Sequence, residues 1–166
     1  SNVCRFIPSI GSYIYGTSSN ALWVNLYVGN EAKFKVGKRQ VELSMTTDYP
    51  WNGDVNLTFR KDYDGEVRLR IPGWCKNFSI SKNDGPVTDY VMDKGYAVLQ
   101  GHWAKGDDIA ITMDMPVELV EANPNVEADQ GLRAIQRGPL VYCAEQIDNV
   151  ESFEQLAVSE DMNWNL

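Results

Sequence analysis

Apolar and polar residues alternate one by one along four runs of this chain, and this period of two constrains the fold more than any other feature. The runs cover residues 41–46, 55–60, 67–71 and 109–114. Successive side chains of a strand point to opposite faces, so each run predicts a strand with one buried and one hydrated face. Strands of this half-buried kind are typical of antiparallel sheets.

Dipeptides that suit tight turns separate these runs. They are Asn52-Gly53, Asp64-Gly65, Asp84-Gly85, Lys94-Gly95 and Lys105-Gly106. Asn, Asp and Gly accept the positive φ angles of two-residue hairpins, and Asp64-Gly65 is the clearest hairpin signal in the chain. Short strands joined by turns, with no helices between them, predict an all-β fold. We expect an antiparallel two-sheet β-sandwich whose dry faces meet.

The start of the chain has helical rather than strand periodicity. The apolar positions at helical spacing are Val3, Phe6, Ile7, Ile10 and Ile14. They predict one short N-terminal helix. Pro8 falls inside it and should kink the helix or move its start, because proline lacks a backbone N–H and crowds the preceding turn.

The alternation stops near residue 149, where an acidic stretch begins. Its acidic residues include Glu151, Glu154, Glu160 and Asp161. This stretch predicts a linker or a tail. The expected organisation is therefore a helix with a connector at 1–20, a β-sandwich domain at 21–148, and an acidic tail or linker to a following domain at 149–166.

Charge and apolar run length argue against two classes of partner. The net charge is −8 and the pI is about 4.6, whereas binding of nucleic acid needs clustered Lys and Arg. Apolar runs such as Ala21 to Val28 fall short of the roughly 20 residues of a membrane-spanning helix. We therefore expect neither a nucleic-acid partner nor a membrane partner, and no signal peptide pattern opens the chain.

Three cysteines, Cys4, Cys75 and Cys143, cannot all pair with one another. None of them has the CxxC spacing of a local zinc site, so no metal site is expected. The prediction is that they are small buried residues with inert thiols. His102 is the single histidine, which excludes a His-rich metal site or a catalytic triad within the chain.

Two further side-chain classes bear on function. Paired carboxylates would indicate glycoside hydrolysis, but the adjacent pairs Asp107-Asp108 and Glu160-Asp161 are expected to stay solvated or to point apart. Aromatic rings stack on sugars. The candidates for carbohydrate contact are Tyr49, Trp51 and Trp74, against the alternative that Trp74, with Trp103, closes an end of the sandwich core.

Four motifs together resemble glycoside hydrolase family 127, the β-L-arabinofuranosidase type. They are Val24-Asn25-Leu26-Tyr27, the segment from Thr47 to Gly53, the segment from Leu69 to Cys75, and the segment from Gln136 to Tyr142. The order and intervals of the motifs carry the resemblance, since an Arg-Gly-Pro turn alone is weak. Residues 3–15 also resemble the last helix of the catalytic domain of that family.

The resemblance implies a bacterial parent enzyme with an (α/α)6-barrel catalytic domain followed by β-sandwich domains. Such enzymes retain configuration, with a zinc-bound cysteine thiolate as nucleophile and a glutamate as general acid and base. The family places a Cys-Cys pair just upstream of the segment that Ser1 to Arg5 resembles, and Cys4 matches neither member. No catalytic residue, metal ligand or cofactor is therefore expected in this chain, and zinc is expected in the parent catalytic domain.

The expected function is a non-catalytic structural domain of a retaining, β-L-arabinofuranosidase-like hydrolase of plant-type arabinofuranosides. Its expected partner is its own catalytic barrel, and an oligosaccharide is a further candidate ligand. The alternative is an autonomous carbohydrate-binding module. A third hypothesis, hydrolysis by the chain itself, predicts stoichiometric zinc and release of nitrophenol from an aryl arabinofuranoside. The sequence leaves the compartment, cytoplasmic or periplasmic, undetermined.

Overall fold

The computed structural model describes residues 2–145, 147 and 157. The chain divides into two compact units, residues 1–114 and 115–166. None of the helices in the described part is long and apolar enough to cross a membrane.

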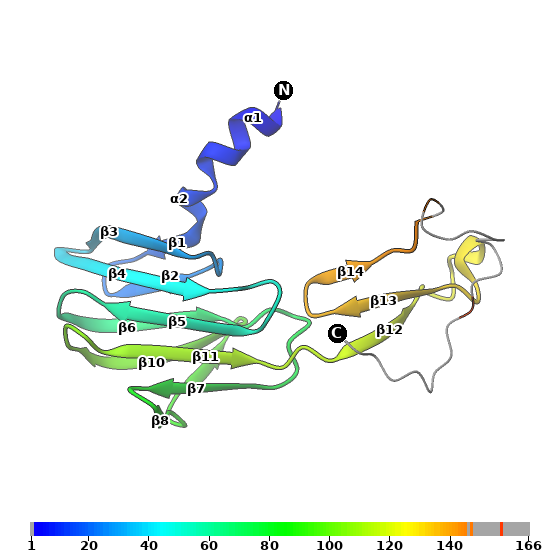
Figure 1. The fold of residues 1–166 in the computed structure, drawn as a ribbon. Helices are drawn as coiled ribbons and strands as arrows, with labels where there is room; N and C mark the ends of the chain where they lie inside the picture. Colours follow the sequence, from blue (N-terminus) through cyan, green and yellow to red (C-terminus); the bar gives the residue numbers. More distant parts are fainter. Residues whose placement is uncertain (1, 146, 148–156, 158–166) are drawn as a thin grey trace. The chain divides into compact units, whose positions relative to one another are not determined.

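The first unit holds two sheets (Figure 1). The five-stranded sheet has the order β1-β2-β6-β10-β9. Its strands are β1 (Tyr15–Thr17), β2 (Ala21–Val24), β6 (Tyr63–Arg70), β9 (Val91–Asp93) and β10 (Tyr96–Trp103). All neighbours pair antiparallel except β2 and β6. Those two can pair parallel because the chain between them passes through the other sheet, which supplies the long crossover that parallel pairing needs.

The six-stranded sheet has the order β3-β4-β5-β11-β7-β8, and all its pairs are antiparallel. Its strands are β3 (Asn30–Val36), β4 (Arg39–Thr47), β5 (Asp54–Phe59), β7 (Phe78–Lys82), β8 (Gly85–Pro86) and β11 (Asp108–Met113). Together the two sheets form the predicted all-β sandwich.

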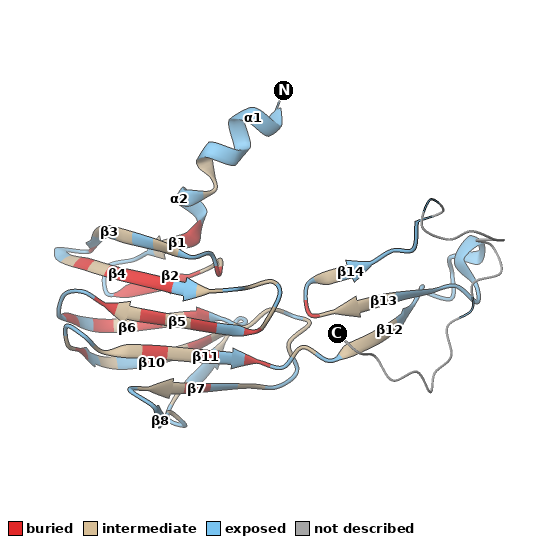
Figure 2. Cartoon of the chain, viewed as in Figure 1, coloured by how far each residue is buried: buried red, intermediate tan, exposed pale blue. Residues whose placement is uncertain are grey.

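The core lies between the inner faces of the two sheets, and the four alternating runs supply much of it (Figure 2). The apolar members of the runs are buried, except Ile71, which is half-buried, while most of the intervening residues are at least partly accessible. The largest side chains below 2% exposure are Tyr63, Phe59, Leu22, Leu43, Leu57, Leu69, Ile109 and Ile111. Burial of such a side chain contributes about 1.5–3 kcal/mol, so this shared core holds the two sheets together.

The turn prediction at Asp64-Gly65 is wrong, because both residues lie inside strand β6, and the one at Asp84-Gly85 is shifted by one residue, because Asn83 and Asp84 form the turn and Gly85 begins β8. Gly65 pairs with Gly101 of β10, and a Cβ at Gly65 would stand 2.4 Å from the Tyr63 hydroxyl and 2.9 Å from the Asn20 carbonyl oxygen. The glycine is thus needed for close approach rather than for a turn. Lys94-Gly95 does join two paired strands, β9 and β10, with φ angles of 49° and 83°.

The predicted N-terminal helix is present but divided. It consists of α1 (Asn2–Phe6), a 3-10 turn at Ile7–Ser9 and α2 (Gly11–Ile14), with Pro8 in the 3-10 turn. Proline cannot donate the hydrogen bond that would continue a regular α-helix, which explains the break. Within residues 2–14, only Ile14 is buried.

The second unit contains a separate three-stranded sheet, β12-β13-β14. Its elements are β12 (Val117–Glu121), the 3-10 turn η2 (Glu127–Asp129), β13 (Arg133–Arg137) and β14 (Leu140–Tyr142). The division at 114/115 falls inside the range 21–148 that the sequence assigned to one domain. Alternation marks a strand but does not say which sheet the strand joins. The predicted acidic tail lies, except for residue 157, outside the described residues.

Candidate functional site

Strand direction gathers the loops of the sandwich at two ends, and one end is rich in aromatic residues. Strands β2, β4 and β6 end at this side, where they lead into the loops 25–29, 48–53 and 71–77. We call these three loops the aromatic end. Among the described residues, all three sequence candidates for sugar contact lie on two of these loops, Tyr49 and Trp51 on one and Trp74 on another.

The rings of three loops contact one another at the aromatic end. Tyr49 stacks on Trp74 with 6.4 Å between ring centroids and an interplanar angle of 21°, and Tyr27 meets Tyr49 edge-on at 5.9 Å. The Tyr27 hydroxyl donates a hydrogen bond to the Arg70 carbonyl oxygen. Burial raises the pKa of Tyr27 and, less strongly, that of Tyr49, which disfavours the ionised form of both hydroxyls.

Trp51 differs from its neighbours because 70% of its surface is exposed. Its loop is held by a series of hydrogen bonds. The Trp51 N–H donates to the Asp48 carbonyl oxygen at 2.8 Å, and the Thr47 hydroxyl donates to the Asp54 carbonyl oxygen at 2.6 Å. Gly53 is buried, and a Cβ there would lie 1.9 Å from the Met113 carbonyl oxygen. The loop therefore presents a large ring to solvent from a fixed backbone.

The alternative prediction that tryptophans close the core is confirmed for Trp103. It is 3% exposed, its indole N–H donates to the Gly65 carbonyl oxygen at 3.0 Å, and it stacks on Phe59 at 5.6 Å. Trp74 is half-buried and packs against the core. Sugar contact by Tyr49, Trp51 or Trp74 stays a prediction.

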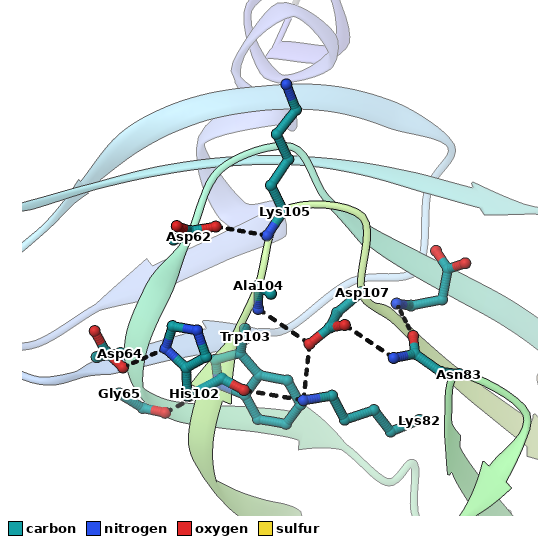
Figure 3. A network of polar contacts seen from close by, with 11 residues as sticks. Asp62, Asp64, Gly65, Lys82, Asn83, His102, Trp103, Ala104, Lys105 and Asp107 are labelled. Atoms are coloured by element: carbon teal, nitrogen blue, oxygen red, sulfur yellow. Dashed lines mark hydrogen bonds and ion pairs between the residues drawn. The ribbon is translucent and has the colours of Figure 1, made fainter.

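The opposite end of the sandwich is lined by charged and polar residues (Figure 3). We call it the polar end and define it by the loops 60–62, 83–84 and 104–107. Lys82 Nζ lies 2.8 Å from a carboxylate oxygen of Asp107, donates to the His102 carbonyl oxygen at 2.9 Å and stands 4.9 Å from the centre of the Trp103 ring. A carboxylate, a carbonyl oxygen and an aromatic ring thus all contact or face this ammonium group.

Asp107 organises the turn between β10 and β11. Its carboxylate accepts hydrogen bonds from the Ala104 N–H at 3.0 Å and the Asn83 amide at 2.8 Å, as well as from Lys82. These donors, with Lys82 first, lower the pKa of Asp107 to about 2. Such a carboxylate is a poor general acid or base at neutral pH, because it stays ionised and its acceptor sites are filled.

The neighbouring carboxylate, Asp108, accepts hydrogen bonds from a different set of donors. It accepts hydrogen bonds from the Thr58 hydroxyl and the Asn56 amide on the outer face of the six-stranded sheet. Asp107 and Asp108 therefore do not share a site. Two carboxylates that face one bond are what glycoside hydrolysis by a carboxylate pair requires, and this pair does not provide them.

Sequence reasoning missed one stacked cluster on the outer face of the five-stranded sheet. The Arg68 guanidinium lies 4.2 Å from the centre of the Trp23 ring, and Tyr96 meets the same ring edge-on at 4.9 Å. Glu66 and Asp93 both form ion pairs with Arg68. Trp23 and Arg68 are register partners across β2 and β6, a pairing that alternation in the sequence does not reveal.

Family models match almost all of the chain. Residues 21–115 match the model described as "Beta-L-arabinofuranosidase, GH127 middle domain", and residues 117–166 match the C-terminal domain of glycoside hydrolase family 127. The chain belongs to glycoside hydrolase family 127. The border between the two family models lies beside the 114/115 division of the structure.

Relatives within family 127 agree in sequence and structure. A non-reducing end β-L-arabinofuranosidase of Bifidobacterium longum is 35% identical in an alignment that covers 89% of this chain and 23% of that protein. The crystal structure of a family 127 β-L-arabinofuranosidase from Geobacillus stearothermophilus is 42% identical, with a TM-score of 0.82 over 89% of this chain and 24% of its own. A family 127 β-arabinofuranosidase structure with 39% identity has a TM-score of 0.83 over 89% and 26%.

This family 127 chain thus spans about a quarter of the length of the relatives it matches. The resemblance to the family implies zinc held by cysteines and a glutamate. Among the described residues, no group of three or more His, Cys, Asp or Glu side chains could hold a metal ion. The described donors therefore do not fit the zinc of the family.

The predicted burial of the cysteines is wrong for two of them, since Cys4 and Cys143 are exposed and Cys75 is half-buried. Cys4 lies in α1, before the sandwich, and Cys143 directly follows β14 of the second unit, and residue type alone does not reveal these positions. The Cys75 thiol donates to the Asn77 carbonyl oxygen at 3.1 Å, and its partial burial raises the pKa of this thiol. A raised pKa disfavours the thiolate and hence nucleophilic chemistry at Cys75.

Proposed function

We propose that this chain is the non-catalytic β-sandwich part of a retaining hydrolase of plant-type β-L-arabinofuranosides, and that it supports the catalytic (α/α)6 barrel of the same polypeptide. The activity of the named relatives gives the substrate class, and the short share of their length that this chain covers leaves room for a catalytic domain. The zinc that the family implies would then be bound outside this chain.

The observation that carries the supporting role is the exposure of apolar residues before the sandwich. Val3, Phe6, Ile7 and Tyr13 are each 57–62% exposed in the helical segment 2–14. A helix that presents apolar residues to water generally packs against a neighbour in its complete setting. The segment also precedes residue 21, where the match to the middle domain begins. The proposed neighbour is therefore the catalytic domain.

A direct assay tests this proposal. Residues 1–166 and the intact polypeptide would be incubated with an aryl β-L-arabinofuranoside, and zinc content would be measured on the same samples. The proposal predicts turnover and stoichiometric zinc for the intact polypeptide, and neither for residues 1–166. Turnover by residues 1–166 alone would overturn it.

The exposed ring of Trp51 favours a second candidate, an autonomous carbohydrate-binding module. An exposed aromatic ring on a hydrogen-bonded loop is a suitable surface for stacking on a sugar. Isothermal titration of residues 1–166 with arabinan oligosaccharides tests this function, with the Trp51→Ala variant as control. Heat of binding that disappears in the variant would support the module, and no heat at millimolar ligand would remove it.

A further inference from the structure

Basic residues gather at one corner of the first unit, although the chain as a whole is acidic. Seven of its 15 Lys and Arg residues are exposed on β3, at the start of β4 and in neighbouring loops of the sandwich. We call this surface the basic corner and define it by these seven residues: Lys33, Lys35, Lys38, Arg39, Arg60, Lys61 and Lys105. The acidic residues among them are Glu31, Glu42 and Asp62, so positive charge is in excess there.

Pairing of β3 with β4 brings lysines from distant parts of the sequence together. Lys33 is the register partner of Glu42, and its Nζ lies 2.9 Å from a Glu42 carboxylate oxygen. Lys35 is the register partner of Gln40, whose side-chain oxygen accepts a hydrogen bond from Lys61 at 3.1 Å. Strands β3 and β4 and the loop after β5 therefore present their cations on one face of the six-stranded sheet.

The Glu42 carboxyl reports the positive field of the basic corner. The hydrogen bond from Lys33 lowers the pKa of Glu42, and the charges of Lys61 and Lys105 lower it further. The Lys105 side chain points away from the polar network around Asp107 (Figure 3). One carboxylate cannot neutralise three lysines, so the corner keeps a positive charge.

A shallow hollow of about 400 Å³ lies on the same face. Its lining residues are Glu31, Ala32, Lys33, Glu42, Leu43 and Arg60. The Arg60 side chain is held beside the hollow, since its Nε donates to the Ser44 hydroxyl at 3.2 Å. Cations pair with carboxylates of a ligand, whereas the carboxylates of the lining accept hydrogen bonds from hydroxyl groups. This lining therefore suits a ligand that carries both carboxylates and hydroxyls.

The basic corner lies at the end of the sandwich that is away from both chain connections. Tyr15 of β1 pairs with Val24, directly before the loop 25–29, so the helical segment joins at the aromatic end. Strand β11 also ends there, since Thr112 pairs with Asp54. The six residues of β11 span roughly 20 Å, which separates these connections from the polar end. A ligand can thus approach the corner without displacing either connection.

The kinds of side chain at the corner select among anionic partners. The core of a protein interface is enriched in aromatic residues and depleted in lysine. Within residues 30–47 and 60–62, all of which the structure describes, no large hydrophobic residue is exposed. A polyphosphate such as nucleic acid would be repelled by the net charge of −8 of the chain. A hydrated polymer with single, spaced carboxylates meets neither objection.

We propose that the basic corner binds an acidic polysaccharide, a sugar polymer whose residues carry carboxylates. Its lysines pair with these carboxylates, while Glu31, Gln40 and Glu42 exchange hydrogen bonds with the hydroxyl groups of the sugar. The choice of a carbohydrate rests on the proposed function, because a hydrolase of plant-type arabinofuranosides acts among sugar polymers. The site is separate from the rings of the aromatic end, and it binds the polymer without cleaving it.

Isothermal titration of residues 1–166 with polygalacturonate at low salt tests the proposal. The corner variant carries Lys33→Gln, Lys61→Gln and Lys105→Gln. The control variant has the same net charge and carries three substitutions at exposed positions outside the corner, Arg5→Gln, Lys76→Gln and Lys94→Gln. We expect binding about ten-fold weaker in the corner variant, because three exposed ion pairs are lost, and wild-type affinity in the control variant. Added salt should weaken binding by the wild type.

Urea unfolding checks that the variants fold, and both should have the wild-type midpoint. If the midpoint of the corner variant falls, Lys105→Gln alone is titrated against Lys94→Gln, with an expected loss of about two-fold in affinity. This pair of single variants again differs only in whether the lost charge belongs to the corner. The comparison therefore remains decisive even if the triple substitution disturbs folding.

Four results would overturn the proposal. They are no heat with polygalacturonate, equal affinities of the wild type and the corner variant, equal losses in the corner and control variants, and binding that is independent of salt. Poly-L-glutamate that binds as tightly as polygalacturonate would also contradict it, because the corner would then recognise an acidic peptide. The hydrolysis assay on residues 1–166 uses a different ligand and readout, so failure of the proposed function would be recognised separately.

Discussion

The two ends of the sandwich differ in chemistry, because charged groups line one end and aromatic rings line the other. At the polar end, Lys82 and Asp107 satisfy one another and the backbone around them, and Trp103 is buried beneath them. At the aromatic end, Tyr49 stacks on Trp74 beside the core, while Trp51 is 70% exposed. The first end is held by charged groups that satisfy one another. The second is held by ring packing and by the close approach of backbone segments, so the same kind of substitution should have different effects at the two ends.

The largest expected effect comes from a comparison of the two ends, with one Trp→Ala substitution at each. Trp103→Ala removes a ring that is 3% exposed, stacks on Phe59 and donates to the Gly65 carbonyl oxygen. We expect it to destabilise residues 1–166 by about 4 kcal/mol, because it leaves a cavity and an unpaired carbonyl. Trp51→Ala should change the unfolding free energy by less than about 0.5 kcal/mol. Urea unfolding of both variants gives the comparison, and similar losses would contradict it.

The second effect concerns the rigidity of the aromatic end. Gly53→Ala places a Cβ 1.9 Å from the Met113 carbonyl oxygen, which is backbone and cannot rotate away. We expect a loss of about 3 kcal/mol in unfolding free energy from this overpacking. Gly73→Ala, in another loop of the same end, meets nothing within 4 Å and should be neutral. Equal denaturant midpoints for the two variants would show that the close approach of Gly53 to the Met113 carbonyl oxygen does not constrain the loop of Trp51.

The smallest effect belongs to the polar end and depends on pH. The pKa of Asp107 is lowered from 3.8 to about 2 in the folded state, chiefly by Lys82. A lowered folded pKa contributes stability above pH 3.8 and loses it as pH falls towards 2. Asp107→Asn should therefore cost about 1 kcal/mol at pH 7, after allowance for screening by water, and less as pH approaches 2.

The matched control for this pH dependence is Asp84→Asn, at an exposed turn residue of the same end. It should leave the unfolding free energy nearly unchanged at both pH 7 and pH 2. Urea unfolding at pH 7 and at pH 2 gives the unfolding free energies of the wild type, Asp107→Asn and Asp84→Asn. A constant difference between wild type and Asp107→Asn across this range would contradict the assigned role of the Asp107 carboxylate.

The sequence predicted the sandwich well because alternation reports the buried face of a strand directly. Val41, Leu57 and Ile109 are all buried as their positions required. It failed at Asp64-Gly65, because a glycine needed for close approach to the Tyr63 ring looks the same as a turn glycine. It also could not reveal that the strands after residue 115 form a sheet of their own, since alternation marks a strand but not the sheet that the strand joins.

The candidate site was predictable only in part. The cluster of Tyr49, Trp51 and Trp74 was found from residue type and loop position, because large rings beside turn residues are easily recognised. Which ring is buried was not, since burial depends on loops that are distant in sequence, as in the contact between Tyr27 and Tyr49. The stack of Arg68 on Trp23 was missed for the same reason.

Hydroxyl-radical footprinting of Tyr13 tests the central claim, that the helical segment 2–14 packs against the preceding domain, most directly. The oxidation rate of Tyr13, which is 57% exposed, would be compared between residues 1–166 and the intact polypeptide by mass spectrometry, with His102 of the Asp64 pair, whose side chain is 60% exposed, as reference. We predict strong protection of Tyr13 in the intact polypeptide and no change at His102. Equal oxidation of Tyr13 in both proteins would contradict the account.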